Sequence, residues 1–553
     1  MSAVMRRHTP RRIAATVLAI GAMTAVTACT GGGSGTTTSA APDGLSDAIT
    51  AIMEQPRYDK ASWSIEVTDL DSGKSLYSAN PDRLAFTGST RKLFSVGLAL
   101  KELGADHRTT TSVYRSGPLD GSGVLHGDLN LVGAGDLTFG GRRTADGGLA
   151  YTDFDHNDAN NLGTAILTPQ DPLAGVDQLA QQVKASGIHA VDGNVAIDDR
   201  LFPAYRVPNN DLLITPTMVN ENMVDVTITP TTPGQPAKVV YRPESAALKV
   251  VSTVLTTAEG TEPTVTLPKV AAPSGQEVTG LVTCVAQPGC TAQVTGTIPV
   301  GYTAPLSGEH SFVGTFRVED PASYARTTFI EALERAGVTV SAPAVAPNPS
   351  DTLPASTANT RTNRVASLVS PEFGAQAKLI LKVSLNLGAN LALTQFGLAH
   401  REKTLADALA TERKAIVGLK IPSAGFDFPT NGSGSPDSRA TPTAIVDMLT
   451  AMSHTDVADT YKKALPILGV NGSLAHTGTD MAAKGHVYGK TGTTITGGKL
   501  EAQTLAGYVD TAAGHRLAFA ICLNDYGPIG SIEDVTTVFT DEAAITNALY
   551  KIG

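Results

Sequence analysis

The stretch "GHVYGKTGTT", residues 485–494, contains two short patterns that belong to different folds. Gly-Lys-Thr ends the phosphate-binding loop of nucleotide enzymes, whereas Lys-Thr-Gly lies on a strand of serine acyl-transfer enzymes. A phosphate-binding loop needs a further glycine five residues before Gly489, and that position is Lys484. The loop should also follow a buried hydrophobic strand, but "GTDMAAK" precedes it. The stretch therefore favours an acyl-transfer strand over a phosphate-binding loop.

Two further patterns occur in the order that such a strand requires. Ser89 and Lys92 begin the apolar segment "STRKLFSVGLALKELG", which predicts a buried helix ending at Gly104. Their separation of three brings both side chains to one face, where a lysine kept neutral by burial can take the serine proton. Ser384 and Asn386 form a Ser-x-Asn pair between two helical stretches. Alone, Ser89 and Lys92 also fit a helix cap and a solvated lysine, but the ordered set is typical of penicillin-recognising serine enzymes.

The secondary-structure pattern predicts one sheet built from both ends of the chain. A strand hairpin is expected over residues 62–78, and a strand–turn–strand–helix pattern over residues 502–552. Between residues 112 and 362, short Val/Thr-rich strands alternate with Pro/Gly turns, which predicts a large β-rich insertion. We therefore expect an α/β (α+β) fold, in which a sheet flanked by helices forms the catalytic domain and the insertion forms one or two extra domains.

These patterns also suggest domain boundaries within the 553 residues. The ranges, in chain order, are 45–112 plus 363–553 for the catalytic domain, 113–230 plus 300–362 for the β-rich insertion domain, and 231–299 for a small nested β domain.

The amino terminus predicts export. Four arginines precede the 14-residue apolar run 13–26, which is shorter than the roughly 20 residues that span a bilayer and is typical of a signal peptide over residues 1–28. "VTAC", residues 26–29, resembles a bacterial lipobox, so we expect Cys29 to be lipidated and residues 29–44 to form a flexible tether. A cleavable signal with an incidental cysteine is the alternative. The protein would then be anchored to the outer face of the cytoplasmic membrane, in the cell envelope.

Charge and cysteine content exclude several functions. The formal net charge is −10, and removing the four arginines of residues 1–28, which contain no acid, makes it −14. That balance argues against nucleic-acid binding. A Pro-Gly turn separates Cys284 from Cys290, so we expect these two residues to form a disulfide in an oxidising compartment. We expect Cys522 to be a buried strand residue. No Cys/His cluster has metal-ligand spacing, so we expect neither a metal nor a cofactor.

The sequence resembles the D-alanyl-D-alanine carboxypeptidase/endopeptidase family, the class C low-molecular-mass penicillin-binding proteins. The resemblance covers most of the mature chain, including the long insertion between Ser89 and Ser384. It is carried by the three patterns above and by the stretches "GDLNLVGAGDLTF" (127–139), "VDGNVAIDDRLF" (191–202), "VNENMVDVTITPTTPGQPA" (219–237), "NGSG" (431–434) and "LPILGVNGSL" (465–474). One departure is Thr87-Gly88 before Ser89, where the family often has Pro-Ala.

The resemblance implies a serine-type D-Ala-D-Ala carboxypeptidase, and also an endopeptidase, that acts on peptidoglycan stem peptides and binds β-lactams. Ser89 would be the nucleophile, Lys92 its base, and Ser384 a proton relay to the leaving group. Asn386 would bind the substrate amide and orient Lys92, and Lys490 would attract the terminal carboxylate.

The same resemblance assigns the strand residues. Thr491 and Thr493 would line the strand beside the peptide, and the amides of Ser89 and Thr493 would form an oxyanion hole. A side chain at Gly492 would crowd the acylated substrate. Gly432 and Gly434 would mark a tight turn, and Asn431 and Ser433 are weaker candidates for substrate contact.

Two other functions fit parts of the pattern. A β-lactamase would share Ser89, Lys92 and Lys490, but its class A form would also need a Glu-x-x-Leu-Asn run, and none occurs between Asn386 and Lys490. A catalytically inactive envelope lipoprotein that only binds peptidoglycan is the second alternative, which the intact set of motifs opposes.

Overall fold

A computed structural model describes residues 44–208, 213–273, 275 and 277–552. The predicted signal peptide and Cys29, and the tether up to residue 43, lie outside these residues. Among the described residues, no helix combines the length and apolar character needed to cross a membrane.

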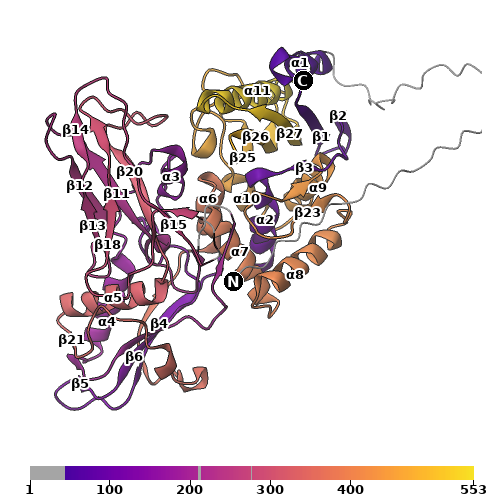
Figure 1. The fold of residues 1–553 in the computed structure, drawn as a ribbon. Coiled ribbons are helices and arrows are strands. Elements are labelled where there is room, and N and C mark those ends of the chain that lie inside the picture. Colours follow the sequence, from indigo (N-terminus) through magenta and orange to yellow (C-terminus); the bar gives the residue numbers. More distant parts are fainter. Residues whose placement is uncertain (1–43, 209–212, 274, 276, 553) are drawn as a thin grey trace, which may run out of the picture. The chain divides into compact units, whose positions relative to one another are not determined.

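The central sheet of the catalytic part joins both ends of the chain, as the sequence predicts (Figure 1). Its five strands are antiparallel to their neighbours. In sheet order they are β2 (Ser75–Ala79), β1 (Ser62–Asp69), β27 (Arg516–Pro528), β26 (Lys499–Asp510) and β25 (Val487–Thr496). The Lys-Thr-Gly pattern lies on β25, which is an edge strand of this sheet.

Successive residues of a strand point to opposite faces of the sheet, and helices cover both faces. On β27, Leu517 and Phe519 pack with α1 (Leu45–Met53) and α11 (Ile532–Tyr550) in one core. Ala518 and Ala520 belong to the opposite core, to which several helices contribute. Its helices are α2 (Lys92–Leu103), α6 (Phe373–Lys382), α7 (Asn386–Ala399), α8 (Leu405–Gly418), α9 (Pro442–Ser453) and α10 (Ala458–Ala464).

The apolar segment that follows Ser89 begins differently from the prediction. Residues Gly88–Arg91 form a 3₁₀ turn, η2, and the α-helix α2 starts only at Lys92. The helix ends where predicted, at Gly104, whose φ of 87° is left-handed and suits glycine. A short sheet next to this turn contains β3 (Ala85–Phe86), β24 (Arg439–Ala440) and β23 (Phe426–Asp427).

The insertion contains two four-stranded sheets and several strand pairs. One sheet has the order β22 (Arg364–Val369), β4 (Thr110–Ser116), β6 (Asp128–Val132) and β8 (Val195–Asp198). The other has the order β12 (Lys238–Arg242), β11 (Met223–Thr229), β20 (Phe312–Val318) and β17 (Leu281–Val282). The shorter strands are β5 (Val124–Leu125), β7 (Ala190–Val191) and β21 (Thr339–Val340) in one sheet, and the pairs β9 (Tyr205–Arg206)/β10 (Leu213–Ile214), β13 (Lys249–Ser252)/β18 (Thr291–Val294), β14 (Leu255–Thr257)/β19 (Thr297–Pro299) and β15 (Lys269–Ala271)/β16 (Glu277–Thr279).

The described residues of the insertion also form helices. α4 (Ala174–Ala185) and α5 (Pro321–Arg335) share a core with the strands of the insertion, and α3 (Ala159–Leu162) is a single short turn. Strands β4 and β22, at the predicted junctions near residues 112 and 363, pair antiparallel with each other. The domain boundaries themselves stay a prediction.

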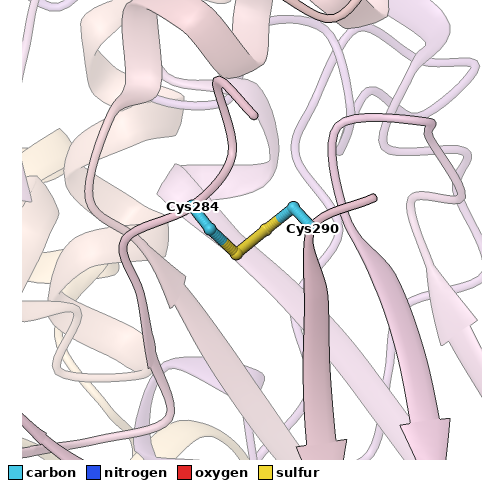
Figure 2. The surroundings of a disulfide bond; sticks show 2 residues. All are labelled: Cys284 and Cys290. Atoms are coloured by element: carbon cyan, nitrogen blue, oxygen red, sulfur yellow. A yellow bond between two sulfur atoms is a disulfide. The ribbon is translucent and has the colours of Figure 1, made fainter. Parts of the chain in front are cut away.

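A disulfide joins Cys284 to Cys290 within the insertion (Figure 2). The two Cα atoms lie 5.3 Å apart, and the intervening turn contains Gly289 with a left-handed φ of 78°. Cys522 is a free, buried residue of β27.

Helix α11 carries an acid in the core behind the sheet. The side chain of Glu542 is fully buried, and burial raises its pKa well above the usual value of a glutamate. Because the folded state then holds a proton that the unfolded state loses, Glu542 reduces stability progressively as the pH rises above about 4.5.

We therefore expect Glu542→Gln, which cannot ionise, to melt at a higher temperature than the wild type at pH 8. The difference should shrink toward pH 4.5, as thermal unfolding followed by circular dichroism would show. Glu54→Gln, at an exposed position after α1, is the control and should change neither value. A melting difference that is the same at both pH values would contradict the assignment of a buried, protonated acid.

Candidate active site

The amino group of Lys92 is the centre of the candidate site. In the 3₁₀ turn η2, residues three apart are nearly eclipsed, so Ser89 lies directly beside Lys92. The Lys92 Nζ atom lies 2.6 Å from Ser89 Oγ and 2.6 Å from Asn386 Oδ1. It also lies 3.3 Å from Ser384 Oγ and 3.1 Å from the carbonyl oxygen of Ser433. The structure thus brings together Ser89, Lys92, Ser384 and Asn386, which the sequence predicted from separate motifs.

Ser384 lies between the two lysines of the site. Its hydroxyl accepts hydrogen bonds from Lys92 Nζ and, at 3.0 Å, from Lys490 Nζ. The backbone of Ser384 has a left-handed φ of 58°, which is unusual for a residue with a β-carbon. Such conformations persist where the surroundings impose them, and they cluster at functional sites. Here the conformation falls in the turn between α6 and α7, and it presents the hydroxyl to both amines.

Burial controls the charge of both lysines. Lys92 is fully buried, and desolvation, followed by the positive charge of Lys490, lowers its pKa well below the usual value. Desolvation also lowers the pKa of Lys490 to about 7. Asp158, a residue of the insertion, acts in the opposite direction and raises the pKa of each lysine. The site can therefore hold a neutral lysine beside the Ser89 hydroxyl, as proton abstraction requires.

The backbone of the turn η2 (Gly88–Arg91) is in contact with the backbone of strand β25. A β-carbon at Gly88 would lie 2.7 Å from the amide nitrogen of Thr493, and one at Gly492 would lie 2.8 Å from the amide nitrogen of Ser89. The two amides predicted to form an oxyanion hole therefore lie at the same contact. Ser89 is half-buried, so the serine hydroxyl remains reachable while Lys92 is not.

Glycine is required at position 492 by the packing around it, whatever a substrate would add. A β-carbon there would lie 2.4 Å from the carbonyl oxygen of Thr87 and 2.3 Å from Thr504 Oγ1. Both distances are too short for real contacts, so the packing of η2 against β25 and β26 already excludes a side chain at Gly492. Crowding of an acylated substrate is not needed to explain this residue.

The threonines of β25 make different contacts. The Thr491 hydroxyl lies 2.8 Å from Ser473 Oγ, and Thr491 is buried. The Thr493 hydroxyl donates to Gln503 Oε1 at 2.9 Å, and Thr493 is half-buried. Their roles toward a substrate stay predictions.

The "NGSG" loop lies on another side of the site, and a buried asparagine stabilises its turn. Asn431 Oδ1 accepts hydrogen bonds from the amides of Ser433, at 2.8 Å, and Gly434, at 2.7 Å, which forms a tight turn. Asn431 and Ser433 are fully buried. This loop contacts the site through the Ser433 carbonyl oxygen, among others, which faces Lys92 Nζ.

Asn390 is a supporting residue that the sequence analysis missed. Its amide group donates to the Asn386 carbonyl oxygen at 2.9 Å and to Ser433 Oγ at 3.0 Å, and its oxygen accepts from the Gly432 amide at 2.9 Å. It thus ties the loop to α7. The spacing of four residues from Asn386 places Asn390 on the same helix face, and this was a usable signal.

Arg91, inside the Ser-x-x-Lys pattern, was also missed. Its guanidinium forms a two-pronged ion pair with Glu412 of α8, at 2.8 and 2.5 Å, and stacks 4.0 Å above the Phe428 ring. Both charged side chains are almost completely buried. Such a pair is costly to break on one side only, so it anchors the nucleophile turn to the helical core.

The predicted site residues outside this cluster are Cys29, which lies beyond the described residues, and Cys284 and Cys290, which form the disulfide of the insertion.

Known proteins resemble this chain in sequence and in fold. The model of the D-Ala-D-Ala carboxypeptidase 3 (S13) family matches residues 45–537. The D-alanyl-D-alanine carboxypeptidase of Actinomadura sp. (strain R39) is 27% identical over 526 residues, which cover 90% of this chain and 85% of that protein. Penicillin binding protein 4 from Haemophilus influenzae superposes with a TM-score of 0.65 at 17% identity, covering 91% of this chain and 99% of that one. Its complex with a novel β-lactam gives a TM-score of 0.63. The fold class predicted from the sequence is confirmed.

We predict that Gly492→Ala displaces β25 from η2 and slows acylation of the protein by a fluorescent penicillin by roughly 10²-fold or more, because small misplacements of reacting groups have effects of that size. Gly121→Ala is the control, since a β-carbon at Gly121 meets nothing within 4 Å. Thermal melting of both variants checks that they fold. Labelling of a folded Gly492→Ala variant at the wild-type rate would rule out this backbone contact as a requirement of the site.

Proposed function

The chain belongs to the D-Ala-D-Ala carboxypeptidase 3 (S13) family, and we propose that it cleaves the terminal D-Ala-D-Ala bond of peptidoglycan stem peptides through an acyl-enzyme on Ser89. A protein of this family is an enzyme, and its reaction class is hydrolysis by a serine nucleophile. The observation that carries the residue assignment is the 2.6 Å distance between Ser89 Oγ and the fully buried Lys92 Nζ.

In the first half-reaction, neutral Lys92 takes the proton of the Ser89 hydroxyl as Oγ attacks the carbonyl carbon of the penultimate D-alanine. Negative charge develops on the carbonyl oxygen. We propose that the amides of Ser89 and Thr493 donate hydrogen bonds to this oxygen. Each such donor is worth on the order of 3 kcal/mol of transition-state stabilisation. When the tetrahedral intermediate collapses, the C–N bond breaks and the leaving D-alanine amine needs one proton.

We assign that proton transfer to Ser384. Its hydroxyl lies 3.3 Å from Lys92 Nζ and 3.0 Å from Lys490 Nζ, so it can pass a proton from protonated Lys92 to the departing amine. In the second half-reaction, water attacks the ester on Ser89 while Lys92 accepts a water proton and returns one to Ser89 Oγ. The products are the shortened peptide and free D-alanine, and the enzyme is regenerated.

The remaining residues are assigned to substrate binding. Asn386 orients Lys92 through the 2.6 Å contact, and we assign to it the binding of the substrate amide. The positive charge of Lys490 attracts the terminal carboxylate, together with the hydroxyls of Thr491 and Thr493. Gly492 contributes by allowing β25 to approach η2, and the peptide would lie along this edge strand.

The same bond chemistry applies to cross-linked peptides, in which the amine that leaves belongs to a neighbouring stem. We propose that the enzyme also acts as an endopeptidase and that β-lactams, as analogues of the D-Ala-D-Ala end, acylate Ser89. The decisive experiment is incubation with a stem pentapeptide and with cross-linked muropeptides, followed by mass spectrometry of the products. Release of D-alanine from the pentapeptide supports the carboxypeptidase, and separation of the stems supports the endopeptidase.

We predict that Ser89→Ala abolishes both labelling by fluorescent penicillin and release of D-alanine, because no other group replaces the nucleophile. The exposed Ser122→Ala is the control and should retain wild-type rates. Labelling that survives in Ser89→Ala would refute the choice of nucleophile. A wild-type protein that takes no label would refute the proposed function as a whole, whereas rapid multiple turnover of nitrocefin would favour a β-lactamase.

We further propose that the enzyme works in the cell envelope. The support is the signal-like segment 1–28, the lipobox-like "VTAC" and the Cys284–Cys290 disulfide, which suits an oxidising compartment. Lipid on Cys29 would hold the protein at the outer face of the cytoplasmic membrane, and residues 29–44 would let it reach the cell wall.

Lipidation predicts that Cys29→Ala moves the protein from the detergent-soluble membrane fraction to the soluble fraction of fractionated cells. Metabolic labelling with a clickable fatty acid should mark the wild type and leave the variant unmarked. Ser34→Ala, in the same tether, is the matched control and should behave as the wild type. Membrane retention of an unlabelled Cys29→Ala protein would show that another feature anchors it.

A further inference from the structure

Six charged side chains form a buried cluster in the insertion, outside the proposed catalytic machinery. Five of them are less than 6% exposed, and the sixth, Arg242, lies at the edge of the cluster. The members are Arg142, Asp155, His156, Glu221, Asp225 and Arg242.

The contacts within this buried charge cluster are close, and the one between Arg142 and Asp155 is two-pronged. Arg142 donates to both carboxylate oxygens of Asp155, at 2.7 and 2.8 Å, and to Glu221 at 2.5 Å. His156 contacts Asp225 through Nδ1 at 2.7 Å and Glu221 through Nε2 at 3.2 Å. Arg242 Nε donates to Asp225 at 3.2 Å.

The cluster is electrically balanced when His156 is protonated. Burial alone would lower the pKa of His156, but the carboxylates of Asp225 and Glu221 raise it to about 10. Three positive groups then face three carboxylates. Asp155, His156 and Glu221 are close enough together to hold a metal ion, but the Arg142 guanidinium already pairs with both carboxylates of that group. The arrangement is therefore a self-compensated ionic network.

Backbone strain is concentrated in the turn that brings Glu221 into the cluster. Asn220, Glu221 and Asn222 have φ values of 47°, 57° and 60°, all in the left-handed region that residues with a β-carbon avoid. Asparagine adopts this conformation more readily than other residues with a β-carbon, so the strain falls mainly on Glu221. The fold retains this turn, which directs Glu221 to both Arg142 and His156.

Two members of the cluster, Asp155 and His156, belong to segment 153–158, whose other residues reach the catalytic part. The Gly472 amide donates to Asp153 Oδ1 at 2.7 Å, and the Phe154 ring stacks on His476 with centroids 5.2 Å apart. Ser473, next to Gly472, contacts Thr491 of β25. Asp158, at the end of the segment, acts electrostatically on Lys92 and Lys490.

We propose that the buried charge cluster is a positioning device that holds segment 153–158 against residues 472–476 and thereby fixes the carboxylate of Asp158 relative to the two lysines. Asp155 and His156 are the points of attachment, and Glu221 connects them to the rest of the insertion. The proposal rests on the proposed function, because it takes Lys92 as the base and Lys490 as a required positive charge. Arg142, His156 and Glu221 are then positioning residues that act through Asp158.

The pH dependence of the acylation rate depends on the position of the Asp158 carboxylate. The rate should rise with pH as Lys92 loses its proton and fall as Lys490 loses its own. The charged groups that act on Lys92 are Lys490 on β25, Arg91 in η2 and Asp158, and Asp158 is the one that raises its pKa. Moving or removing the Asp158 carboxylate lowers the pKa of both lysines, so the bell-shaped profile shifts toward lower pH.

The test measures the second-order rate constant of acylation by benzylpenicillin between pH 5 and pH 10 in the full-length protein. Asp158→Asn should shift the profile to lower pH by about half a unit or more. Glu221→Gln, which does not touch a lysine, should produce most of the same shift and a roughly tenfold loss of kcat/KM for the stem pentapeptide. The double variant should show no further shift, since both changes act through one carboxylate.

Glu319→Gln is the matched control, because Glu319 also pairs with an arginine, Arg206, in the insertion but contacts no residue of segment 153–158 in the hydrogen bonds and ion pairs of the described chain. Its profile should equal that of the wild type. If Glu221→Gln does not fold, His156→Gln tests the same connection. An unshifted profile in a folded cluster variant, or shifts that add in the double variant, would overturn the proposal. A wild-type protein that is not acylated at all would instead refute the proposed function.

Discussion

The structure depends on keeping one amino group away from water. Lys92 has no exposed surface, and an amine in that position is tolerated only when several partners surround it. Its four oxygen neighbours come from the turn η2, the turn at Ser384, the start of α7 and the "NGSG" loop. An ammonium group has three hydrogens, so these four oxygens can satisfy the charged form, and the lone pair of the neutral form can accept the Ser89 proton. The same enclosure therefore stabilises the residue and prepares it for catalysis.

Three parts of the fold converge to build this enclosure. The sheet contributes β25, whose Gly492 allows the strand backbone to touch the nucleophile turn. The helical core contributes α2 and α7, and the Arg91–Glu412 ion pair holds the start of α2 against α8. The insertion shares a hydrophobic core with the catalytic part, since Leu137 and Phe202 pack in the same core as α2 and α7. Tyr205 donates to the Asn390 carbonyl oxygen at 3.0 Å, so the insertion directly supports the helix that carries Asn386.

The extent to which the sequence predicts this structure follows from the range of the interactions involved. Local patterns predict the two-ended sheet, the helix that ends at Gly104 and the order of the three motifs, because periodicity and turn residues act over short distances. The 3₁₀ geometry of η2 and the left-handed Ser384 depend on packing between distant segments, which no local pattern contains. The spacing of Asn390 from Asn386 is a local signal, but the contact of Asn390 with the "NGSG" loop is not. Gly492 is instructive, since the sequence marks it as special but the reason, the Thr87 carbonyl oxygen and the Thr504 hydroxyl, lies 405 and 12 residues away. Asp158 carries no signal at all in the sequence, because its importance arises only from where the insertion places it.

The two lysines make opposite demands on a single environment. In the proposed mechanism, Lys92 must lose its proton to serve as a base, whereas Lys490 must keep one to attract a carboxylate. Both lysines are fully buried, and burial lowers the pKa of each. The positive charge of Lys490 lowers the pKa of Lys92 further. A compensating negative charge is then needed so that Lys490, with a pKa of about 7, remains protonated in a useful fraction of molecules near neutral pH. The acid that raises the pKa of both lysines is Asp158, and it belongs to the insertion. The protonation balance of the site is therefore set jointly by the catalytic core, which excludes water, and by the insertion, which supplies the counter-charge.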